Sequence, residues 1–390
     1  MNVSDREFSQ AAEFAVNLRH ELHMQPELSW KEVKTTQRIV AELEKMGVAI
    51  LKTGCHGTES GVIAEVKGAK PGPCIALRAD IDALPVQEKA ECEWKSQVPN
   101  VMHACGHDSH AAMLVAAAGI IAAHKDEICG SVRFFFQPAE ESGYVSGANF
   151  MVQEGALEGV DAVVGQHVQS DMPKGEIGWR AGVMMASADM WNATVHGQGG
   201  HGSSPHTAID PTIAVAEMIT SLQTIVSREI DPQVAAVVSI GAMKGGDAPN
   251  VIPESVYING TVRTTRKDVR DSMEERFTRI FGGVAAAHRC TYELSYDKLV
   301  PVLANDEKLT LQCLDILKDA GLGDHLKEQR INMGSEDFSF FADKVPATYF
   351  MLGMGTPAPH HNPAFTVDDS VLELGVRLMA SIALDFGKRS

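Results

Sequence analysis

The stretch Val132-Arg-Phe-Phe-Phe136 is one of two short runs that decide the fold class. The other is Cys74-Ile-Ala-Leu77, and both runs are largely apolar with little alternation between apolar and polar residues. Strands that are covered on both faces have this pattern, because neither side of such a strand meets water. Helical stretches lie between several of the expected strands. The alternation of strands and helices predicts an α/β fold built on a mostly parallel sheet.

The middle of the chain has a different order of elements. The expected strands there are residues 187–196, 235–243, 255–263 and 291–296, and the expected helices are residues 211–230 and 267–288. This βαββαβ order is typical of a ferredoxin-like unit. We therefore expect a discontinuous α/β domain of residues 1–184 and 298–390, interrupted by a small domain of residues 185–297.

The composition excludes several classes of protein. The chain has 390 residues, with 34 Lys and Arg against 51 Asp and Glu, so its net charge is −17. This acidic balance argues against nucleic-acid or anionic-membrane partners, which attract basic surfaces. The longest apolar run, residues 111–123, is shorter than the roughly 18 residues needed to cross a bilayer. The polar N-terminus and the seven scattered cysteines favour a cytoplasmic protein without a disulfide framework.

The densest group of reactive side chains is Met102-His-Ala-Cys-Gly-His-Asp-Ser-His110, directly before the apolar run. We expect Asp108 or Ser109 to cap a helix there. Cys105 and His107 place a thiolate and an imidazole close together, which suits zinc, cobalt, nickel or manganese better than calcium. The alternative interpretation is a capped helix that carries these side chains incidentally.

Further candidate ligands follow two of the expected strands. Glu140 and Glu141 come after the 132–136 run, at the carboxyl end of a strand, where α/β proteins form their sites. Two adjacent carboxylates are costly unless a metal stabilises one and the other serves as a general base. His167 ends another expected strand. Taken singly, the Glu pair could be a solvated turn and His167 a core histidine.

A histidine pair, His360 and His361, lies in a Pro-rich loop near the C-terminus. With either of these residues, the candidate ligands outnumber those of one closed tetrahedral site, so the sequence predicts a pair of metal ions. In the stretch 77–85, Asp80 could orient a ligand histidine without touching the metal, although an exposed turn explains that stretch equally well.

Nine stretches together resemble one known family, and they run through nearly the whole chain. They are LRADIDALP (77–85), MHACGHDSH (102–110), FFFQPAEE (134–141), GQHV (165–168), GQGGHGSSPH (197–206), APNVIP (248–253), GTVRT (260–264), MGSEDFSFF (333–341) and HHNPAF (360–365). The family is the metal-dependent amidohydrolases of the aminoacylase/carboxypeptidase superfamily. The resemblance is to the branch with hippurate hydrolases, N-acyl-amino-acid deacylases and indole-acetyl-amino-acid hydrolases.

The resemblance implies a role for each candidate residue. Two divalent metal ions (Zn, Mn, Co or Ni) would be bound by Cys105, His107, Glu141, His167 and His361. Glu140 would be the general base. His201, in a lid domain that also forms a dimer, would reach the neighbouring subunit's site and stabilise an oxyanion. Asn250 and Arg263 would help to hold the substrate carboxylate.

Two positions depart from the family pattern. Gln166 stands where a leucine is usual, and we expect it to alter the wall of the site modestly. The His360–His361 pair leaves the last ligand uncertain by one residue. We favour His361, because the family's ligand precedes x-Pro.

The expected activity is hydrolysis of the amide bond of small N-acyl-L-amino acids, which releases a carboxylic acid and a free amino acid. The expected assembly is a homodimer, with a homotetramer as the alternative. A dipeptidase or carboxypeptidase acting on small peptides is the second hypothesis, and its substrates would carry a free α-amine. A non-catalytic metal-binding or ligand-binding protein on the same scaffold is the third, and such a protein would need only Glu141 of the glutamate pair.

Overall fold

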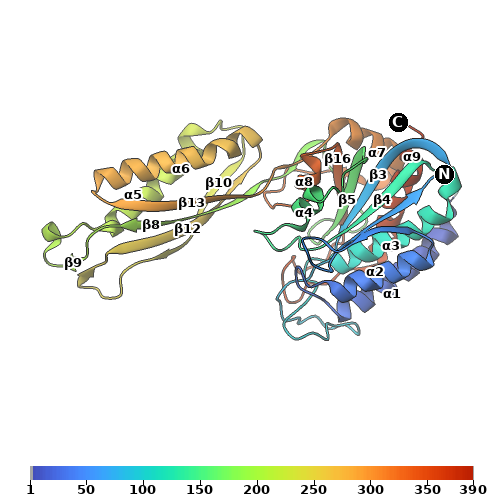
Figure 1. Cartoon of the computed structure of the whole chain (residues 1–390), viewed down its shortest axis with the longest axis horizontal. Helices are drawn as coiled ribbons and strands as arrows, with labels where there is room; N and C mark the ends of the chain where they lie inside the picture. Colours follow the sequence, from blue (N-terminus) through green and yellow to red (C-terminus); the bar gives the residue numbers. More distant parts are fainter. Residues whose placement is uncertain (1–2, 390) are drawn as a thin grey trace. The chain divides into compact units, whose positions relative to one another are not determined.

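A computed structural model describes residues 3–389, which form two compact units (Figure 1). Unit 1 contains residues 3–184, 304–330 and 337–389, and unit 2 contains residues 185–303 and 331–336. The first unit is built on a large mixed sheet with helices, and the second on a small antiparallel sheet with two long helices.

The sheet of unit 1 has the strand order β1-β2-β4-β3-β5-β16-β6-β15 (Figure 1). The strands are β1 (Ala49–Thr53), β2 (Val62–Lys67), β3 (Lys70–Asp80), β4 (Cys129–Gln137), β5 (Ala162–Gln169), β6 (Ile177–Trp179), β15 (Leu326–Glu328) and β16 (Ala347–Gly353). The central run β4-β3-β5-β16 is parallel throughout. Antiparallel pairing enters through β1, β2 and β6. The mostly parallel sheet predicted from the apolar runs is therefore confirmed.

Helices cover both faces of this sheet. They are α1 (Asp5–Met24), α2 (Val33–Lys45), α3 (His107–Ala123), α4 (Gly147–Gln153), α7 (Glu307–Asp319), α8 (Ser339–Ala342) and α9 (Leu372–Phe386). Phe134 and Phe136 of β4 join the same buried core as α1, α3 and α9. Phe135 points to the opposite face, because successive strand side chains alternate, and there it stacks on Phe341 of α8.

The start of α3 differs from the prediction. The helix begins at His107, its N-cap is Gly106, and no side chain caps it, so the predicted cap at Asp108 or Ser109 is wrong. Gly106 has φ +90, and a Cβ there would lie 2.5 Å from Val168. This position therefore requires glycine. Asp108 already lies inside the first turn, and its carboxylate accepts hydrogen bonds from Arg19 and His23 instead.

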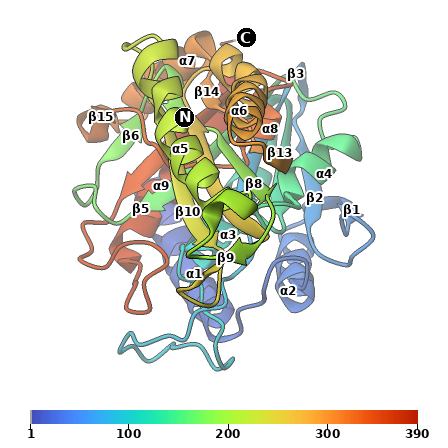
Figure 2. The ribbon, with the colours of Figure 1, turned by 90° about the vertical axis from the view of Figure 1, so that its left-hand side faces the viewer.

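The sheet of unit 2 is antiparallel, with the strand order β10-β12-β8-β13. Its strands are β8 (Ala188–His196), β10 (Ala236–Lys244), β12 (Ser255–Thr264) and β13 (Thr291–Val300), and its long helices are α5 (Pro211–Thr224) and α6 (Lys267–Ala287). Both helices lie on one face of the sheet (Figures 1 and 2), where Trp191 of β8 packs against Phe277 of α6. The short strands β9 (Gly200–His201) and β11 (Val251–Ile252) pair with each other. Two more short strands, β7 (Gly182–Met185) and β14 (Leu303–Asn305), also pair with each other.

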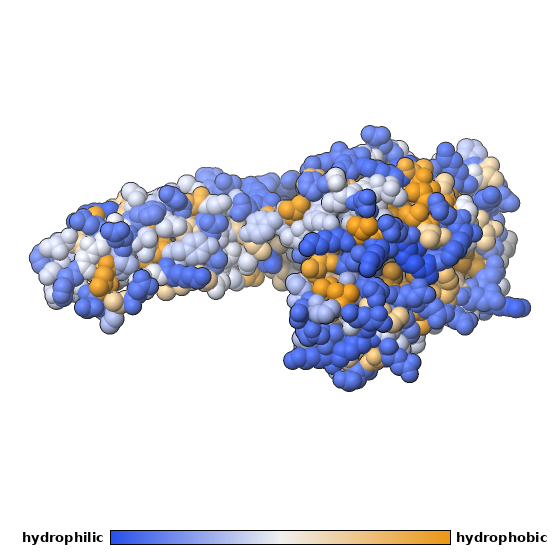
Figure 3. Space-filling view, turned by 60° about the horizontal axis from the view of Figure 1, so that its bottom comes forward, coloured by the Kyte–Doolittle hydropathy of each residue, from blue (hydrophilic) through white to orange (hydrophobic). Residues whose placement is uncertain are grey.

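The surface is mainly hydrophilic on the face drawn in Figure 3, where hydrophobic side chains occur in small groups between charged and polar ones. The apolar residues of both units are gathered in the two buried cores instead. Within residues 3–389, no helix combines the length and the apolar character that crossing a membrane requires.

Candidate metal centre

Three neighbouring elements deliver the candidate ligands to one edge of the unit 1 sheet. Glu140 and Glu141 follow the end of β4, and His167 lies near the end of β5. Cys105 and His107 lie at the start of α3, on the connection that leaves β3. Because β3, β4 and β5 run parallel, their carboxyl ends meet at this edge, as is usual for α/β sites.

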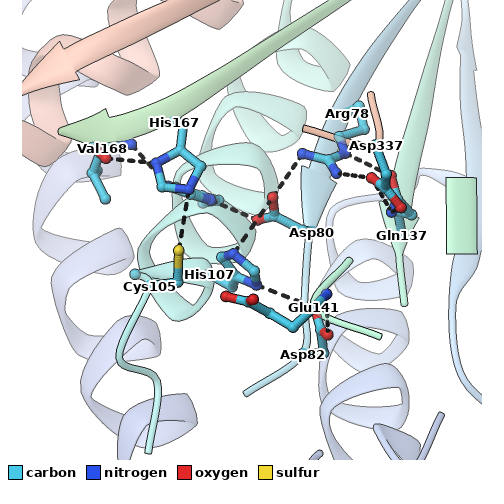
Figure 4. A network of polar contacts seen from close by, with 12 residues as sticks. Arg78, Asp80, Asp82, Cys105, His107, Gln137, Glu141, His167, Val168 and Asp337 are labelled. Carbon is cyan, nitrogen blue, oxygen red and sulfur yellow. Dashed lines mark hydrogen bonds and ion pairs between the residues drawn. The ribbon is translucent and has the colours of Figure 1, made fainter. Parts of the chain in front are cut away.

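Among the described residues, three of the five groups of candidate ligand atoms contain only predicted metal ligands and the predicted base, and Figure 4 shows Cys105, His107, Glu141 and His167 from these groups. Within each group the atoms lie within 4.8 Å of one another, and the groups are Cys105 with His107 and His167, Cys105 with Glu141 and His361, and His107 with Glu140 and Glu141. Residues that are up to 256 positions apart in the sequence are thus brought into one site. The five predicted metal ligands and the predicted base all belong to it.

The contact between Cys105 and His167 has the spacing of two ligands on one ion. The Cys105 Sγ lies 3.4 Å from the His167 Nε2. Ligands at the usual zinc–sulfur and zinc–nitrogen distances, placed tetrahedrally, would be about 3.6 Å apart. The His167 Nδ1 lies 2.5 Å from the Val168 carbonyl oxygen and donates to it, so the Nε2 atom is the one that faces the sulfur (Figure 4).

His107 provides the clearest test of whether a metal ion fits. Its Nδ1 lies 3.1 Å from the Asp82 Oδ1, and its buried Nε2 has no hydrogen-bond partner among the described residues. A ring held by a carboxylate on one nitrogen, with the other nitrogen left open, is the usual arrangement of a metal-binding histidine. The residues present therefore fit a divalent metal ion.

Asp80 has a different partner from the one expected. It was expected to orient a ligand histidine, but its Oδ1 lies 2.5 Å from the Nδ1 of His110, which is not among the predicted ligands. Its Oδ2 accepts a hydrogen bond from Arg78 at 2.6 Å and lies 3.8 Å from the His107 Nε2 (Figure 4). Asp80 therefore belongs to a buried ionic network beside the site.

Asp82 makes the contact that was expected of Asp80, and the sequence reasoning missed it. One carboxylate oxygen bonds His107, and the other accepts the backbone N–H of Glu141 at 3.0 Å. The signal was present, because Asp82 lies in the same stretch 77–85. However, β3 ends at Asp80, and only the path of the chain beyond the strand shows which carboxylate turns toward His107.

The structure distinguishes the two C-terminal histidines. The His361 Nε2 lies 3.1 Å from the Glu141 Oε1, inside the group of candidate ligands. The His360 Nε2 accepts the backbone N–H of Ser170, and its Nδ1 is 3.9 Å from the Cys105 Sγ. Because the His360 Nε2 accepts a hydrogen bond, its Nδ1 carries the proton, and no group of candidate ligands among the described residues includes His360. We therefore retain His361 as the candidate ligand.

Gln166 does not line the site, so the expected effect on the site wall is wrong. Its buried amide nitrogen is 3.4 Å from the carbonyl oxygen of Gly375 and 3.7 Å from the Met113 Sδ. It lies next to His167 on β5 and therefore points to the opposite face of the strand.

The charges of the site favour a bound cation. Burial raises the pKa of the Cys105 thiol, and the nearby carboxylates of Glu141 and Glu140 raise it further. Burial would lower the pKa of His107, but Asp80 and Asp82 outweigh that effect and raise it to about 10. Carboxylates thus dominate the surroundings of the sulfur, and a divalent ion would offset their charge.

In unit 2 the structure brings two of the three predicted residues together. His201 of β9 pairs with Val251 of β11, and the N–H of Gly202 donates to the carbonyl of Asn250 at 2.8 Å. The side chains of His201 and Asn250 are exposed on an open hollow between these strands. Arg263 is half-buried near the far end of β12, roughly 26 Å along that strand from its first residue.

A buried ionic network supports the helix that carries His107. The carboxylate of Asp108 lies 3.0 Å from the Arg19 Nε and 2.8 Å from the His23 Nδ1, and the other ring nitrogen of His23 lies 3.2 Å from Glu88. Burial would lower the pKa of His23, but Asp108 and Glu88 outweigh it and raise the pKa to about 9.

This network predicts a pH-dependent stability. Protonated His23 stabilises the folded chain fully below its unfolded pKa near 6.5, and this contribution disappears as the pH rises through about 9. We expect His23→Gln to lower the free energy of unfolding. This loss is expected to be about 2–3 kcal/mol larger at pH 6 than at pH 9.5. Urea unfolding of the metal-loaded proteins measures this, with the exposed His206→Gln as the control. An equal difference at both pH values would contradict the prediction.

The fold and the candidate metal centre indicate a metal-dependent hydrolase, and comparison with known proteins agrees with this class. Residues 76–385 match peptidase family M20/M25/M40. The chain belongs to this family and is one of its hydrolases.

Three members of the family illustrate which proteins the chain is similar to. It is 38% identical over 369 residues to an N-acetylcysteine deacetylase of Bacillus subtilis, covering 95% of this chain and 96% of that one. It is 37% identical over 383 residues to thermostable carboxypeptidase 1 of Saccharolobus solfataricus, covering 97% and 96%. A crystal structure of the Bacillus subtilis YXEP protein, described as a dinuclear metal-binding peptidase of this family, superposes with a TM-score of 0.87 at 34% identity and covers 99% of this chain and all of that one.

Proposed function

We propose that this enzyme hydrolyses the amide bond of small N-acyl-L-amino acids with the help of two divalent metal ions. The observation that carries the proposal is the convergence of the three ligand groups around Cys105, His107 and Glu141, with Glu140 in the same cluster. A dinuclear metal-binding relative of the same fold and a deacetylase relative of similar length support it.

The chain's own residues have the following proposed roles. The two ions would be held by Cys105, His107, Glu141, His167 and His361. Once bound, they would supply Lewis acidity, which polarises a carbonyl and makes water acidic enough to react near neutral pH. Glu140 accepts the proton of the attacking water and passes it to the leaving amine. Asp82 holds the His107 ring and the Glu141 backbone in place.

Unit 2 would supply groups that contact the substrate. We propose that residues 185–297 form a ferredoxin-like lid that also makes the interface of a homodimer. His201 of a second chain would stabilise the oxyanion, since a preorganised donor at that position is commonly a large catalytic effect. Asn250 and Arg263 would hold the substrate carboxylate, and the planar guanidinium of Arg263 suits that group.

All seven cysteines are free, in keeping with a cytoplasmic enzyme.

A panel of substrates tests the proposed reaction. N-acetyl-, N-benzoyl- and indole-acetyl-L-amino acids are incubated with metal-loaded protein, and release of the free amine is measured. We expect turnover of at least one N-acyl substrate, loss of it with a chelator, and its return with Zn²⁺, Mn²⁺ or Co²⁺. Dipeptides that carry a free α-amine are expected to react at least about tenfold more slowly, because a buried charged amine needs a carboxylate partner.

The same panel separates the alternatives. Faster cleavage of the dipeptides would favour a peptidase, as the name of the carboxypeptidase relative suggests for that protein. Tight metal binding with no hydrolysis of any substrate would favour a non-catalytic binding protein.

A further inference from the structure

The segment that joins α1 to α2 contacts the loop that carries the proposed general base. Glu32, which is fully buried, lies with its Oε1 2.8 Å from the backbone nitrogen of Ala139 and accepts a hydrogen bond from it. Ala139 directly precedes Glu140. The contact joins residues 107 positions apart, and both belong to unit 1.

Helix stability does not explain why Glu32 is buried. Glu32 is the N-cap residue of α2, a position where a side-chain oxygen can accept a hydrogen bond from the first turn of the helix. It makes no such bond and turns into the protein interior instead. A buried carboxyl group is costly, so a residue that gives up its local role at this cost serves another purpose.

The backbone that Glu32 holds is strained. Ala139 has φ +54, in the left-handed region that residues with a side chain rarely adopt. Such a conformation persists only where surrounding contacts impose it. Glu32 accepts the N–H of this strained residue. Rotation of the Ala139 peptide would move Glu140, because Glu140 is the next residue in the chain.

Two neighbours of Glu32 hold other points of the same region. The indole N–H of Trp30 donates to the carbonyl of Val145 at 3.0 Å, beyond the glutamate pair. The Ser29 hydroxyl donates to Asp82 at 2.7 Å, through the carboxylate oxygen that also accepts the N–H of Glu141. One short segment therefore holds the chain directly before the proposed base and at two points after it, one of them through Asp82.

We propose that Glu32 is a positioning residue, whose buried carboxyl oxygen fixes the Ala139 peptide and thereby sets the place of the Glu140 carboxylate. The inference rests on the proposed function, because it assumes that Glu140 is the base. It requires only the acceptor oxygen of Glu32 and no contact with the substrate.

Three variants of the metal-loaded enzyme test the proposal, assayed with the N-acyl-amino acid that the panel identifies as the best substrate. Glu32→Ala is expected to lower kcat by about 10- to 100-fold with KM changed less than about threefold, because small misplacements of a catalytic group are costly. Glu32→Gln keeps the acceptor oxygen and is expected to retain kcat within about threefold. Glu42→Ala is the matched control, since Glu42 is a nearly buried glutamate of α2 that pairs with Arg38 and Lys45.

A second measurement does not depend on activity. Hydrogen–deuterium exchange of peptides spanning residues 134–146 is expected to speed up in Glu32→Ala and to stay near wild type in Glu32→Gln, with metal content unchanged in both. If Glu32→Ala does not fold, Glu32→Asp, whose oxygen is withdrawn by one methylene, is expected to show an intermediate loss of kcat and faster exchange.

The outcomes separate this inference from the proposed function. Wild-type kcat and wild-type exchange in Glu32→Ala would overturn the positioning role. So would a Glu32→Gln variant as impaired in kcat as Glu32→Ala. If Glu140→Gln keeps full turnover in the same assay, the proposed base is wrong, whereas the exchange data still report whether Glu32 holds the loop.

Discussion

Replacing Glu140 by Gln is expected to lower kcat by about 10²- to 10⁴-fold, which corresponds to about 2.7–5.5 kcal/mol of transition-state stabilisation. The glutamine keeps the shape of the side chain but cannot accept a proton from water. Glu140 lies with His107 and Glu141 in one group of candidate ligands, so a proton accepted there would be held close to the proposed metal ions. Turnover is measured as release of free amine at saturating N-acyl-amino acid.

Metal content decides how that result is interpreted. We expect Glu140→Gln to keep its metal ions, because the proposed ligand of the pair is Glu141, while Glu141→Gln loses metal and activity together. The exposed Glu91→Gln serves as the control and should behave as wild type. A Glu140→Gln protein with undiminished kcat would refute the assignment of the base.

Replacing Cys105 by Ala is expected to have a comparably large effect, through loss of metal. The sulfur is common to two of the ligand groups and lies 3.4 Å from the His167 Nε2. Removing a residue that merely orients a ligand weakens metal binding by about 10- to 100-fold, so removing a ligand should cost at least about 100-fold. Metal per chain after dialysis, measured by elemental analysis, is expected to fall, and hydrolysis should fall with it.

The matched control for this change is Cys74→Ala. Cys74 is buried to a similar degree in β3, and its pKa is likewise raised mainly by burial, but no candidate ligand group includes it. It should keep its metal and its activity. Wild-type metal content in Cys105→Ala would remove Cys105 from the metal centre.

Local patterns were sufficient for the plan of unit 1. A run such as 132–136 is largely apolar on both faces, so it predicts a strand covered on both sides, and Phe134, Phe135 and Phe136 of β4 are buried as expected. The same runs indicate where strands end, and hence that Glu140 and His167 lie at one edge of the sheet. Helix ends were harder to predict, because several residues can cap a helix, and at α3 the N-cap is Gly106 with no side-chain cap.

By itself, the sequence determined the parallel α/β plan, the candidate ligands and the family of hydrolases. Only the tertiary structure decided that Asp82 rather than Asp80 bonds His107, that His361 meets Glu141, and that Glu32 leaves its own helix to hold Ala139. The physical reason is the separation along the sequence of the residues that interact. Apolar periodicity arises from neighbours along the chain, whereas a hydrogen bond between distant side chains depends on angles and distances set by the whole folded core.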